Sequence, residues 1–452
     1  MQKYSYFWVF VCVWLCSNPI HAETLLELYQ LAEQHDPQLK IANSERQATL
    51  EKKPQARATL LPQVSLSANV NENWRLNDNP LNDGMENSSI GYNVSLKYAL
   101  YRRDRQIQLE QVDNEILRAE AIYVRAQQEL IERLASSYFA VLAANDNTKF
   151  AFSAKKAFKR QADEAQQRFE VGLIAITDVQ EAQAGYDLAV ADEILARNEL
   201  DNAHEELREI TGSYHKVLAI LSEDAPLLSP NPADIDTWTE YAIEQNPRIK
   251  AAQYQVASAH QEVAKQRAAN LPTLDLVGQH SYDDVFRGDK NPLGDEIITS
   301  SVGIQFNYQL YEGGAIRSRI KEARLGHVQA LDRLEQLHRT VQSQTRQAFL
   351  SLLSNISRVK ALEKALLSTE TAFNAIRTGF ELGTRTSVDV VNAQRDLLRA
   401  QRNYSQARYN YVIDTLRLKL AAGLLSKKDL IGINNWLTQH RIELQTEYKS
   451  TN

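Results

Sequence analysis

Two short segments of the chain, residues 168–179 and 379–390, combine a glycine with carboxylate, hydroxyl and guanidinium groups. Glycine readily adopts the left-handed backbone conformation that ends many helices, and it occurs here as Gly172 and Gly383. Oxygen-bearing side chains follow each glycine, and such oxygens accept hydrogen bonds from the free N–H groups that open a helix. Each segment therefore predicts a helix end, a tight turn and a new helix. The candidate capping residues are Thr177, Asp178 and Ser387.

Two other motifs suggest catalysis or ligand binding, but their spacing argues against both. His204-Glu-Glu-Leu-Arg208 begins like a zinc-protease helix and then has arginine where the second histidine ligand belongs. Gly313-Gly314 is not followed by the Lys-Ser/Thr pair of a phosphate loop, so we expect a hinge between a strand and a helix. The nine histidines are scattered along the chain. We predict neither a metal site nor a cofactor.

The composition predicts long helices. The 452 residues include only 16 Gly and 11 Pro, so little of the chain is available for linkers. Stretches rich in Ala, Leu, Glu, Gln and Arg are typical of extended helices and coiled coils, not of a compact enzyme. A net charge of −6 leaves no basic face for phosphates, which argues against a nucleic-acid partner.

The N-terminus resembles a secretory signal peptide. Lys3 precedes an apolar run at residues 7–16, and a small residue stands at Ala22, after which we expect cleavage. No later segment offers the roughly 18 uninterrupted apolar residues of a membrane-spanning helix. Cys12 and Cys16 both lie in the leader, so the mature chain is expected to be free of disulfides.

The mature chain is expected to begin with helices and a β-hairpin. An apolar stripe of helical period starts at Leu25, is broken or kinked at Asp36-Pro37 and resumes to about Leu60. Apolar residues then alternate with polar ones over 64–70 and again over 92–100, which predicts two strands with one apolar and one polar face. The polar residues 71–89 between them predict a long loop.

A very long helix follows the hairpin. Residues 101–171 contain no proline and no turn cluster, and their apolar residues recur at spacings of three and four. This predicts roughly 70 helical residues, about 105 Å long. The turn at Gly172 then returns the chain along a helix of half that length, at about 177–210.

The whole pattern occurs twice. Pro37 answers to Pro247 and Pro62 to Pro272, each pair 210 residues apart, and Gly172 answers to Gly383 at 211. Gene duplication explains this register most simply. We expect the following parts: a signal peptide (1–22); a first repeat (23–225) with hairpin 63–101 and tip turn 172–176; a linker (226–237); a second repeat (238–437) with hairpin 273–311 and tip turn 383–387; and a C-terminal tail (438–452).

The expected helix lengths and strand number imply that the chain packs against other chains. Two short helices placed end to end match one long helix, so each half forms a rod about 100 Å long that is too thin to bury its apolar stripes alone. Strands with one apolar and one polar face are typical of an outer-membrane β-barrel. In lipid such a sheet must close into a ring, because an open edge leaves backbone groups unpaired. Four strands cannot close; two chains supply eight strands and a filled interior, and three supply twelve and a passage. A soluble sandwich also gives period two, but the leader and the strand tyrosines favour the membrane.

Several strings in the chain resemble the TolC family of outer-membrane channel-tunnels, and the likeness covers about Glu23 to Leu437. The strings are Leu60-Leu-Pro-Gln63, Arg168-Phe-Glu-Val-Gly-Leu-Ile-Ala-Ile-Thr-Asp-Val-Gln180, Leu271-Pro-Thr-Leu274, Tyr311-Glu-Gly-Gly314, Gly383-Thr-Arg-Thr-Ser-Val-Asp-Val390 and Ala407-Arg-Tyr-Asn-Tyr411. The resemblance implies a mainly α protein with membrane β-structure. In that fold a homotrimer forms a 12-stranded transmembrane β-barrel, with four strands per chain, and a long antiparallel coiled-coil α-helical barrel across the periplasm.

The resemblance also implies a function without catalysis. Members of the family are outer-membrane exit ducts of tripartite efflux pumps and type I secretion systems. The implied partners are outer-membrane lipid, a periplasmic adaptor (membrane fusion) protein and an inner-membrane transporter of the RND, ABC or MFS type. The alternative is a periplasmic structural or adaptor coiled-coil protein without a pore, although adaptors normally have one hairpin and lack amphipathic strands.

Carried over by position, the family's gate falls on the two tip segments. Arg385 would contact Thr177 and Asp178 of a neighbouring chain, and Asp389 would project a carboxylate ring into the aperture. Two residues depart from the family pattern: Phe380 replaces a tyrosine whose hydroxyl helps to hold the closed state, and Asn392 replaces a second acidic ring. A phenyl ring donates no hydrogen bond, so we expect Phe380 to leave the gate with fewer closing contacts. Because Asn392 carries no charge, we also expect weaker cation selectivity. The resemblance also places adaptor docking at Gly172, Leu173, Gly383 and Thr384.

A simpler role remains open for these charged residues. Asp178, Asp389 and Arg385 could act only at helix ends, because an aspartate in the first turn of a helix usually caps it. The two roles are compatible, since a capping carboxylate can also accept an arginine.

Overall fold

The computed structural model describes residues 22–74, 86–288 and 296–438. The expected signal peptide up to His21, both cysteines and the tail from residue 439 lie outside these ranges. The helices are α1 (Leu25–His35), α2 (Pro37–Leu50), α3 (Lys52–Ala58), α4 (Arg103–Glu170), α5 (Ile176–Thr211), α6 (Ile235–Gln245), α7 (Pro247–Ala268), α8 (Ala315–Glu381), α9 (Ser387–Ala421) and α10 (Lys427–Asn434). The strands are β1 (Gln63–Trp74), β2 (Glu86–Tyr101), β3 (Ile220–Leu221), β4 (Thr273–Gly288), β5 (Glu296–Asn307) and β6 (Leu437–Thr438).

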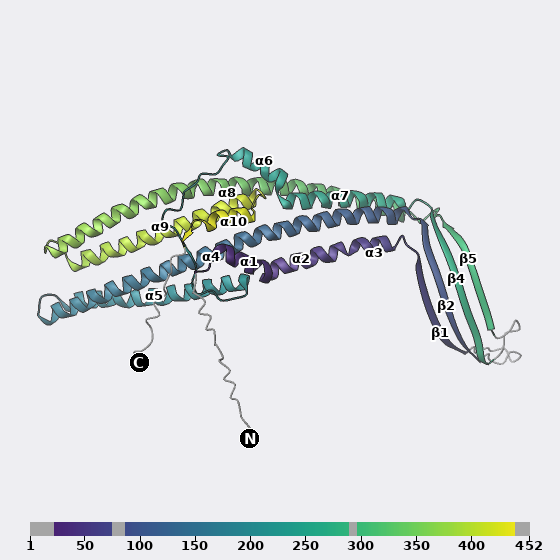
Figure 1. Ribbon diagram of the computed structural model, residues 1–452, viewed down its shortest axis with the longest axis horizontal. Helices are drawn as coiled ribbons and strands as arrows, with labels where there is room; N and C mark the ends of the chain where they lie inside the picture. The colour runs from purple at the N-terminus through teal and green to yellow at the C-terminus, as the bar shows by residue number, and fades with distance from the viewer. Residues whose placement is uncertain (1–21, 75–85, 289–295, 439–452) are drawn as a thin grey trace, which may run out of the picture.

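The molecule is a long rod of helices with a sheet at one end (Figure 1). Helix α4 has 68 residues and α8 has 67, and each folds back at the far end of the rod onto its partner, α5 or α9. At the other end the strands bend away from the helix axis. The prediction of a mainly helical protein is confirmed. No helix within the described ranges is both long and apolar enough to cross a membrane.

The first expected helix is divided at Asp36. Its carboxylate accepts a hydrogen bond from the Leu39 N–H at 2.8 Å, and Pro37 occupies the first position of α2, where a proline costs no hydrogen bond. Asn246 and Pro247 repeat this arrangement at the start of α7. The sequence therefore supplies a helix stop and a new helix start at the same place. The helical segment that was expected to continue to about Leu60 consists of α2 and α3 and ends at Ala58.

The strands form one antiparallel sheet in the order β1-β2-β4-β5. The register pairs Leu66 with Val94 and Val70 with Ile90, so the apolar positions predicted from period two lie on a common face. The same alignment continues through β4 to β5, where Leu276 is opposite Ile304. Both edge strands, β1 and β5, lack a second partner within the described chain.

The strands differ from the expected hairpins at their ends. β1 and β2 extend into the polar residues expected to form a loop, and Asp283 and Asp284 also lie in β4, opposite β5. Strand pairing satisfies backbone groups whatever the side chain, which is why a polar composition misplaced these boundaries. β5 instead ends at Asn307, short of the expected residue 311, because its partner β4 begins at Thr273.

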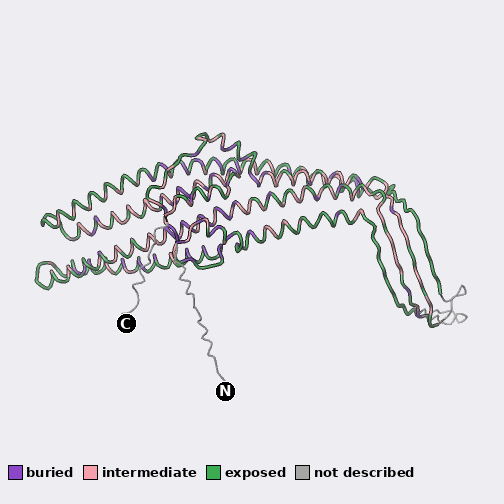
Figure 2. The backbone as a smooth tube through the Cα atoms, in the orientation of Figure 1, coloured by how far each residue is buried: buried purple, intermediate pink, exposed green. Residues whose placement is uncertain are grey.

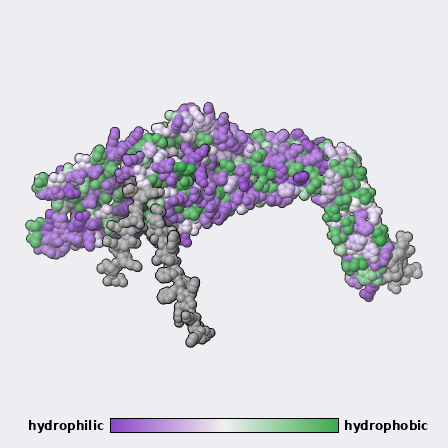
Figure 3. Space-filling view, in the orientation of Figure 1, coloured by the Kyte–Doolittle hydropathy of each residue, from purple (hydrophilic) through white to green (hydrophobic). Residues whose placement is uncertain are grey.

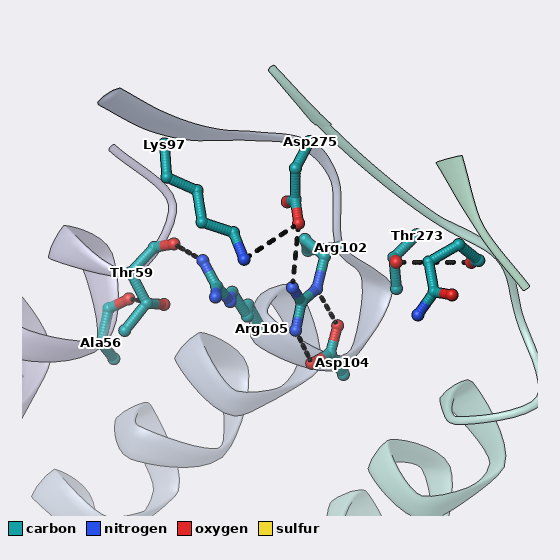
Figure 4. A network of polar contacts seen from close by, with 9 residues as sticks. Ala56, Thr59, Lys97, Arg102, Asp104, Arg105, Thr273 and Asp275 are labelled. Atoms are coloured by element: carbon teal, nitrogen blue, oxygen red, sulfur yellow. Dashed lines mark hydrogen bonds and ion pairs between the residues drawn. The ribbon is translucent and has the colours of Figure 1, made fainter. Parts of the chain in front are cut away.

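A charged cluster holds the sheet at its angle to the helices (Figure 4). Asp275 of β4 is only 6% exposed and lies 3.5 Å from both the Lys97 ammonium and the Arg102 guanidinium. Arg102 also pairs with Asp104 at 3.1 Å, and Arg105 donates to the Thr59 carbonyl at the end of α3. These contacts connect β2, β4, α4 and the chain leaving α3, so they fix the bend between strands and rod.

The core lies in the middle of the rod, whereas the tips and the outer strands β1 and β5 are largely exposed (Figure 2). Here α1, α6, α10 and the short β3–β6 sheet surround the two long hairpins. The expected linker 226–237 is shorter than predicted, because α6 begins at Ile235. Core residues from across the sequence include Leu28, Leu134, Phe139, Trp238, Leu352 and Val412.

A buried ion-pair cluster joins α4 to α5 on the way to the first tip. Glu193 of α5 is 3% exposed and lies 2.6 Å from the Lys155 ammonium and 2.5 Å from the Arg197 guanidinium. Burial alone would raise the pKa of the Glu193 carboxyl, but the two cations hold it below its usual value.

We expect Glu193→Gln to lower stability by about 1–2 kcal/mol at neutral pH, because it leaves two cations without their shared carboxylate. A lowered folded-state pKa contributes stability above the unfolded-state pKa, and that contribution is lost as the pH falls through the folded value. The stability difference between Glu193→Gln and wild type should therefore become smaller at acidic pH. Thermal midpoints measured by circular dichroism against pH will test this. Glu199→Gln, an exposed change on the same helix, should have little effect, and equal losses for both variants would contradict the prediction.

Candidate functional site

The two tips of the rod share one backbone design. At the first tip Gly172 has φ +75°, its N–H donates to the Phe169 carbonyl at 2.8 Å, and the Leu173 N–H donates to the Arg168 carbonyl at 2.9 Å. This pair of hydrogen bonds satisfies carbonyls at the helix end and requires a left-handed residue, for which glycine is best suited. The second tip repeats it at Gly383, with φ +77° and bonds of 3.0 and 2.8 Å from Gly383 and Thr384.

At the starts of the helices that leave the tips, Asp178 acts at the cap as predicted, but the hydroxyl cap of α9 differs from the prediction. Thr386 caps α9, one residue before the expected Ser387: its hydroxyl accepts the Asp389 N–H at 3.2 Å, and Asp389 accepts the Thr386 N–H at 2.9 Å. At the first tip Asp178 accepts the Ala175 N–H at 3.3 Å. Both aspartates thus lie at the third helical position, where a carboxylate reaches back to the cap. The capping role is therefore present in the single chain.

The Asp389 carboxylate is stabilised in its charged form. The Thr386 N–H and hydroxyl both donate to it, and with Arg385 nearby they hold the pKa of Asp389 below its usual value. The Asp389 carboxylate also lies in the first turn of α9, at the positive end of the helix dipole. Asp389 is therefore a persistent negative charge at neutral pH.

We expect Thr386→Ala to raise the pKa of Asp389 part of the way to its ordinary value and to cost about 1 kcal/mol of tip stability, because both hydrogen bonds of the Thr386 hydroxyl with Asp389 are lost while the backbone N–H bond remains. A titration of aspartate-labelled protein by ¹³C NMR, with Asp389→Asn to identify the signal, will measure the shift. Thr384→Ala is the matched control, since the Thr384 hydroxyl donates to the Gly379 carbonyl instead. An unchanged Asp389 titration in Thr386→Ala would refute this account of the low pKa.

Arg385 is an exposed residue that lies across the end of its own hairpin. A Cβ added at Gly379 would come within 2.8 Å of the Arg385 Cγ, so this glycine makes room for the arginine stem. Phe380 follows on α8 and is half-buried. No ion pair joins Arg385 to Asp178 within the described chain, and the expected contact with a neighbouring chain stays a prediction. Thr177 is exposed in the first turn of α5.

A polar stripe continues from Asp389 along α9. Asn392 is exposed three residues later, and Asp396 is exposed four residues after that. Residues at these spacings share one helix face. Asp396 was missed in the sequence, although the same helical spacing identifies it.

The tips also present apolar side chains to solvent, visible at the far end of the rod (Figure 3). Leu173 is 73% exposed and Leu382 is 75% exposed. Exposed apolar side chains next to charged helix starts are suited to binding another protein. The remaining apolar tip residues are Val171, Ile176 and Val388.

A groove of 490 Å³ separates the two hairpins behind the tips. Phe158 of α4 lies in it, with the Arg395 guanidinium of α9 at 4.9 Å from its ring centroid. The other side of the ring faces Gly185 of α5, where an added Cβ would be 3.1 Å from the ring edge. This cation–π contact connects the hairpins within one chain. Sequence patterns gave no signal for it, because its three residues come from three helices.

Comparison with known proteins gives consistent matches over nearly the whole chain. The family model described as "Outer membrane efflux protein" matches residues 28–213 and again 238–424. The chain is 35% identical to "Outer membrane protein TolC" from Vibrio cholerae, covering 96% of this chain and 98% of that protein. It is 34% identical to the Escherichia coli protein of the same name, covering 94% and 87%.

More distant matches extend this similarity. "Alkaline protease secretion protein AprF" from Pseudomonas aeruginosa is 29% identical over 90% of this chain and 85% of its own length. Among solved structures, the Campylobacter jejuni CmeC outer membrane channel aligns with a TM-score of 0.74 at 18% identity, covering 92% of this chain and 90% of that one. At that identity the structural match establishes the fold alone.

Proposed function

Since the chain belongs to the outer membrane efflux protein family, we propose that it works as a homotrimeric channel whose helix tips form the gate. The family membership makes it an outer-membrane exit duct for efflux and secretion, with a helical tunnel in the periplasm. The predictions of function and location are thereby confirmed. The proteins that define the family are channels, not enzymes.

The main support for a trimer is the open four-stranded sheet. Within the described ranges its outer strands, β1 and β5, pair on one side only, and one face is lined by exposed apolar residues such as Leu66 and Val302. A sheet in lipid must close on itself, because no water satisfies its edges. Three copies of β1-β2-β4-β5 supply twelve strands, which is enough for a barrel with a passage.

Duplication within the chain supports the matching helical tunnel. The family model fits each half once, and both halves contain the same glycine turn at the tip. Three chains would contribute six hairpins, so twelve helical rods would line the tunnel. We propose that its narrow end is closed by Arg385 against Thr177 and Asp178 of the neighbouring chain. Asp389 would then form a ring of three carboxylates.

The exposed tips fit the proposed adaptor contacts. Gly172, Leu173, Gly383 and Thr384 lie in the two tip turns, with apolar side chains beside them. We propose that they receive a periplasmic adaptor, which links the duct to an inner-membrane transporter of the RND, ABC or MFS type. The relative named for alkaline protease secretion makes protein export as well as small-molecule efflux a candidate task.

One experiment separates the duct from a pore-free periplasmic adaptor. The full-length protein is expressed in a Gram-negative host, its membranes are fractionated, and unheated samples are run on a denaturing gel. We expect a band of three chains in the outer-membrane fraction and ion conductance after reconstitution into a planar bilayer. A monomer in the periplasmic fraction would overturn the proposal. Deletion of the gene, with drug susceptibility and protein export measured in parallel, then identifies the cargo.

A further inference from the structure

A cavity of 290 Å³ lies in the middle of the rod, where the segment 226–234 and helix α10 cover α8 and α9. Leu352 of α8 and Leu416 of α9 line its interior, and neither is more than 2% exposed. The floor of the cavity is therefore part of the buried core. Three aromatic residues, Trp238, Tyr411 and Trp436, also line it, beside polar residues such as Asn231 and Thr415.

The aromatic groups hold the covering segment in place. The Tyr411 hydroxyl accepts the Leu228 N–H at 2.7 Å and donates to the Leu228 carbonyl at 3.1 Å. The Trp238 indole N–H donates to the Pro232 carbonyl at 2.7 Å. These polar atoms already have partners, so the two rings offer the cavity mainly apolar surface. Both ends of the segment are fixed, which makes the cavity a preformed one.

The charges around the cavity leave one cation in excess. Lys419 lies 2.5 Å from Asp429, so these two charges compensate each other. Lys428 also lines the cavity, is exposed, and forms no ion pair with any residue in the described ranges. The site thus combines an apolar aromatic interior with a single positive charge at its exposed side.

We propose that this cavity binds a small organic anion with a flat apolar body, of the class of aromatic carboxylates. Its volume is at the lower end of the range of roughly 300–1,000 Å³ that is usual for ligand pockets, so it suits a single ring with a short acidic chain. The ring would lie between the tryptophans, and the carboxylate would pair with Lys428. The cavity is far along the rod from both the tips and the strands (Figure 1), so the proposal is independent of the gate.

Tryptophan fluorescence reports on this site directly. The chain has five tryptophans, of which Trp8 and Trp14 lie in the expected signal peptide. In the mature Trp74→Phe variant the signal would come only from Trp238 and Trp436, which both line the cavity. The probe is 4-phenylbutyrate, with the neutral 4-phenylbutanol as its isostere, titrated into the mature protein in lipid nanodiscs. We expect a saturable change with the acid and binding about fivefold weaker with the alcohol.

Two positions on α10 provide the variants. Lys428 and Gly432 are four residues apart and so share a helix face. A Cβ at Gly432 would meet no atom within 4 Å, so the backbone tolerates Gly432→Leu, which adds a bulky side chain to the lining of the cavity. Gly326→Leu is the matched control, because Gly326 is also helical with nothing within 4 Å but does not line the cavity.

We expect Lys428→Gln to weaken the acid about fivefold and leave the alcohol unchanged, and Gly432→Leu to abolish saturation while Gly326→Leu preserves it. The proposal fails if wild type gives no saturable change, if Gly432→Leu binds as wild type does, or if Lys428→Gln affects acid and alcohol equally. Circular dichroism melting of every variant separates loss of binding from loss of fold.

Discussion

Replacing Arg133 by methionine is expected to destabilise the protein by about 2–3 kcal/mol, the largest loss that we predict for a single side chain outside the apolar core. Arg133 of α4 holds both carboxylate oxygens of Asp36, at 3.1 and 2.8 Å. Asp36 is 1% exposed, so without the guanidinium its charge would remain buried with a backbone N–H as its main partner. Methionine fills similar volume but supplies neither charge nor donors. Arg133 is itself 26% exposed, which keeps the estimate below that for a fully buried pair.

The second half of the chain indicates how the loss can be reversed. Asn246 occupies the place of Asp36 there: it caps α7 through the Arg248 N–H at 2.9 Å and donates to the Ala421 carbonyl at 2.8 Å. A neutral cap therefore needs no arginine. We expect Asp36→Asn combined with Arg133→Met to recover all but about 1 kcal/mol, since asparagine is as good a cap as aspartate.

Thermal unfolding at one fixed scan rate, followed by circular dichroism, measures the three variants in one cycle. A positive coupling between the two substitutions is the expected sign, because each single change leaves one charge without its partner. If Arg133→Met melts with wild type, or if the double variant is less stable than Arg133→Met, the pair does not have the role assigned to it.

The long-range architecture could be predicted because it depends on simple periodicities. Spacings of three and four residues without proline define α4 and α8, and glycine marks both turns. Alternation of polar and apolar residues likewise places Leu66 and Val94 on one sheet face. Such patterns are local, and one strong physical constraint dominates each of them.

The details that the sequence did not predict depend on contacts between distant segments. The pairing of β4 with β5 extends the strands through Asp283 and Asp284, which by composition resemble a loop. Arg395 stacks on Phe158 only because α9 lies beside α4. The choice of Thr386 over Ser387 as the cap depends on where the turn after Gly383 ends, within a single residue. Boundaries and cross-helix contacts of this kind require the packed structure.

Changing Asn392 to aspartate is expected to tighten block of the open channel by a trivalent cation about tenfold or more. In the proposed trimer the change adds three carboxylates one helical turn from the Asp389 ring, and charges at that spacing act on the same ion. Asn392 is exposed on the α9 face that also carries Asp389, so the described residues of its own chain leave it accessible. Planar-bilayer conductance against blocker concentration measures the effect, and Asn392→Gln is the neutral control.

Phe380→Tyr tests the other half of the same gate. Its hydroxyl would restore a donor at the half-buried position where α8 approaches the tip, and each added closing bond lowers the population of the open state. We expect resting conductance to fall, with block by cations unchanged, because no charge is introduced. The two variants therefore act on separate quantities: one changes how often the gate opens, and the other changes how strongly its ring holds a cation. If neither resting conductance nor multivalent block responds to either substitution, residues 380 and 392 do not belong to the gate, and the closing contacts must lie elsewhere on the tips.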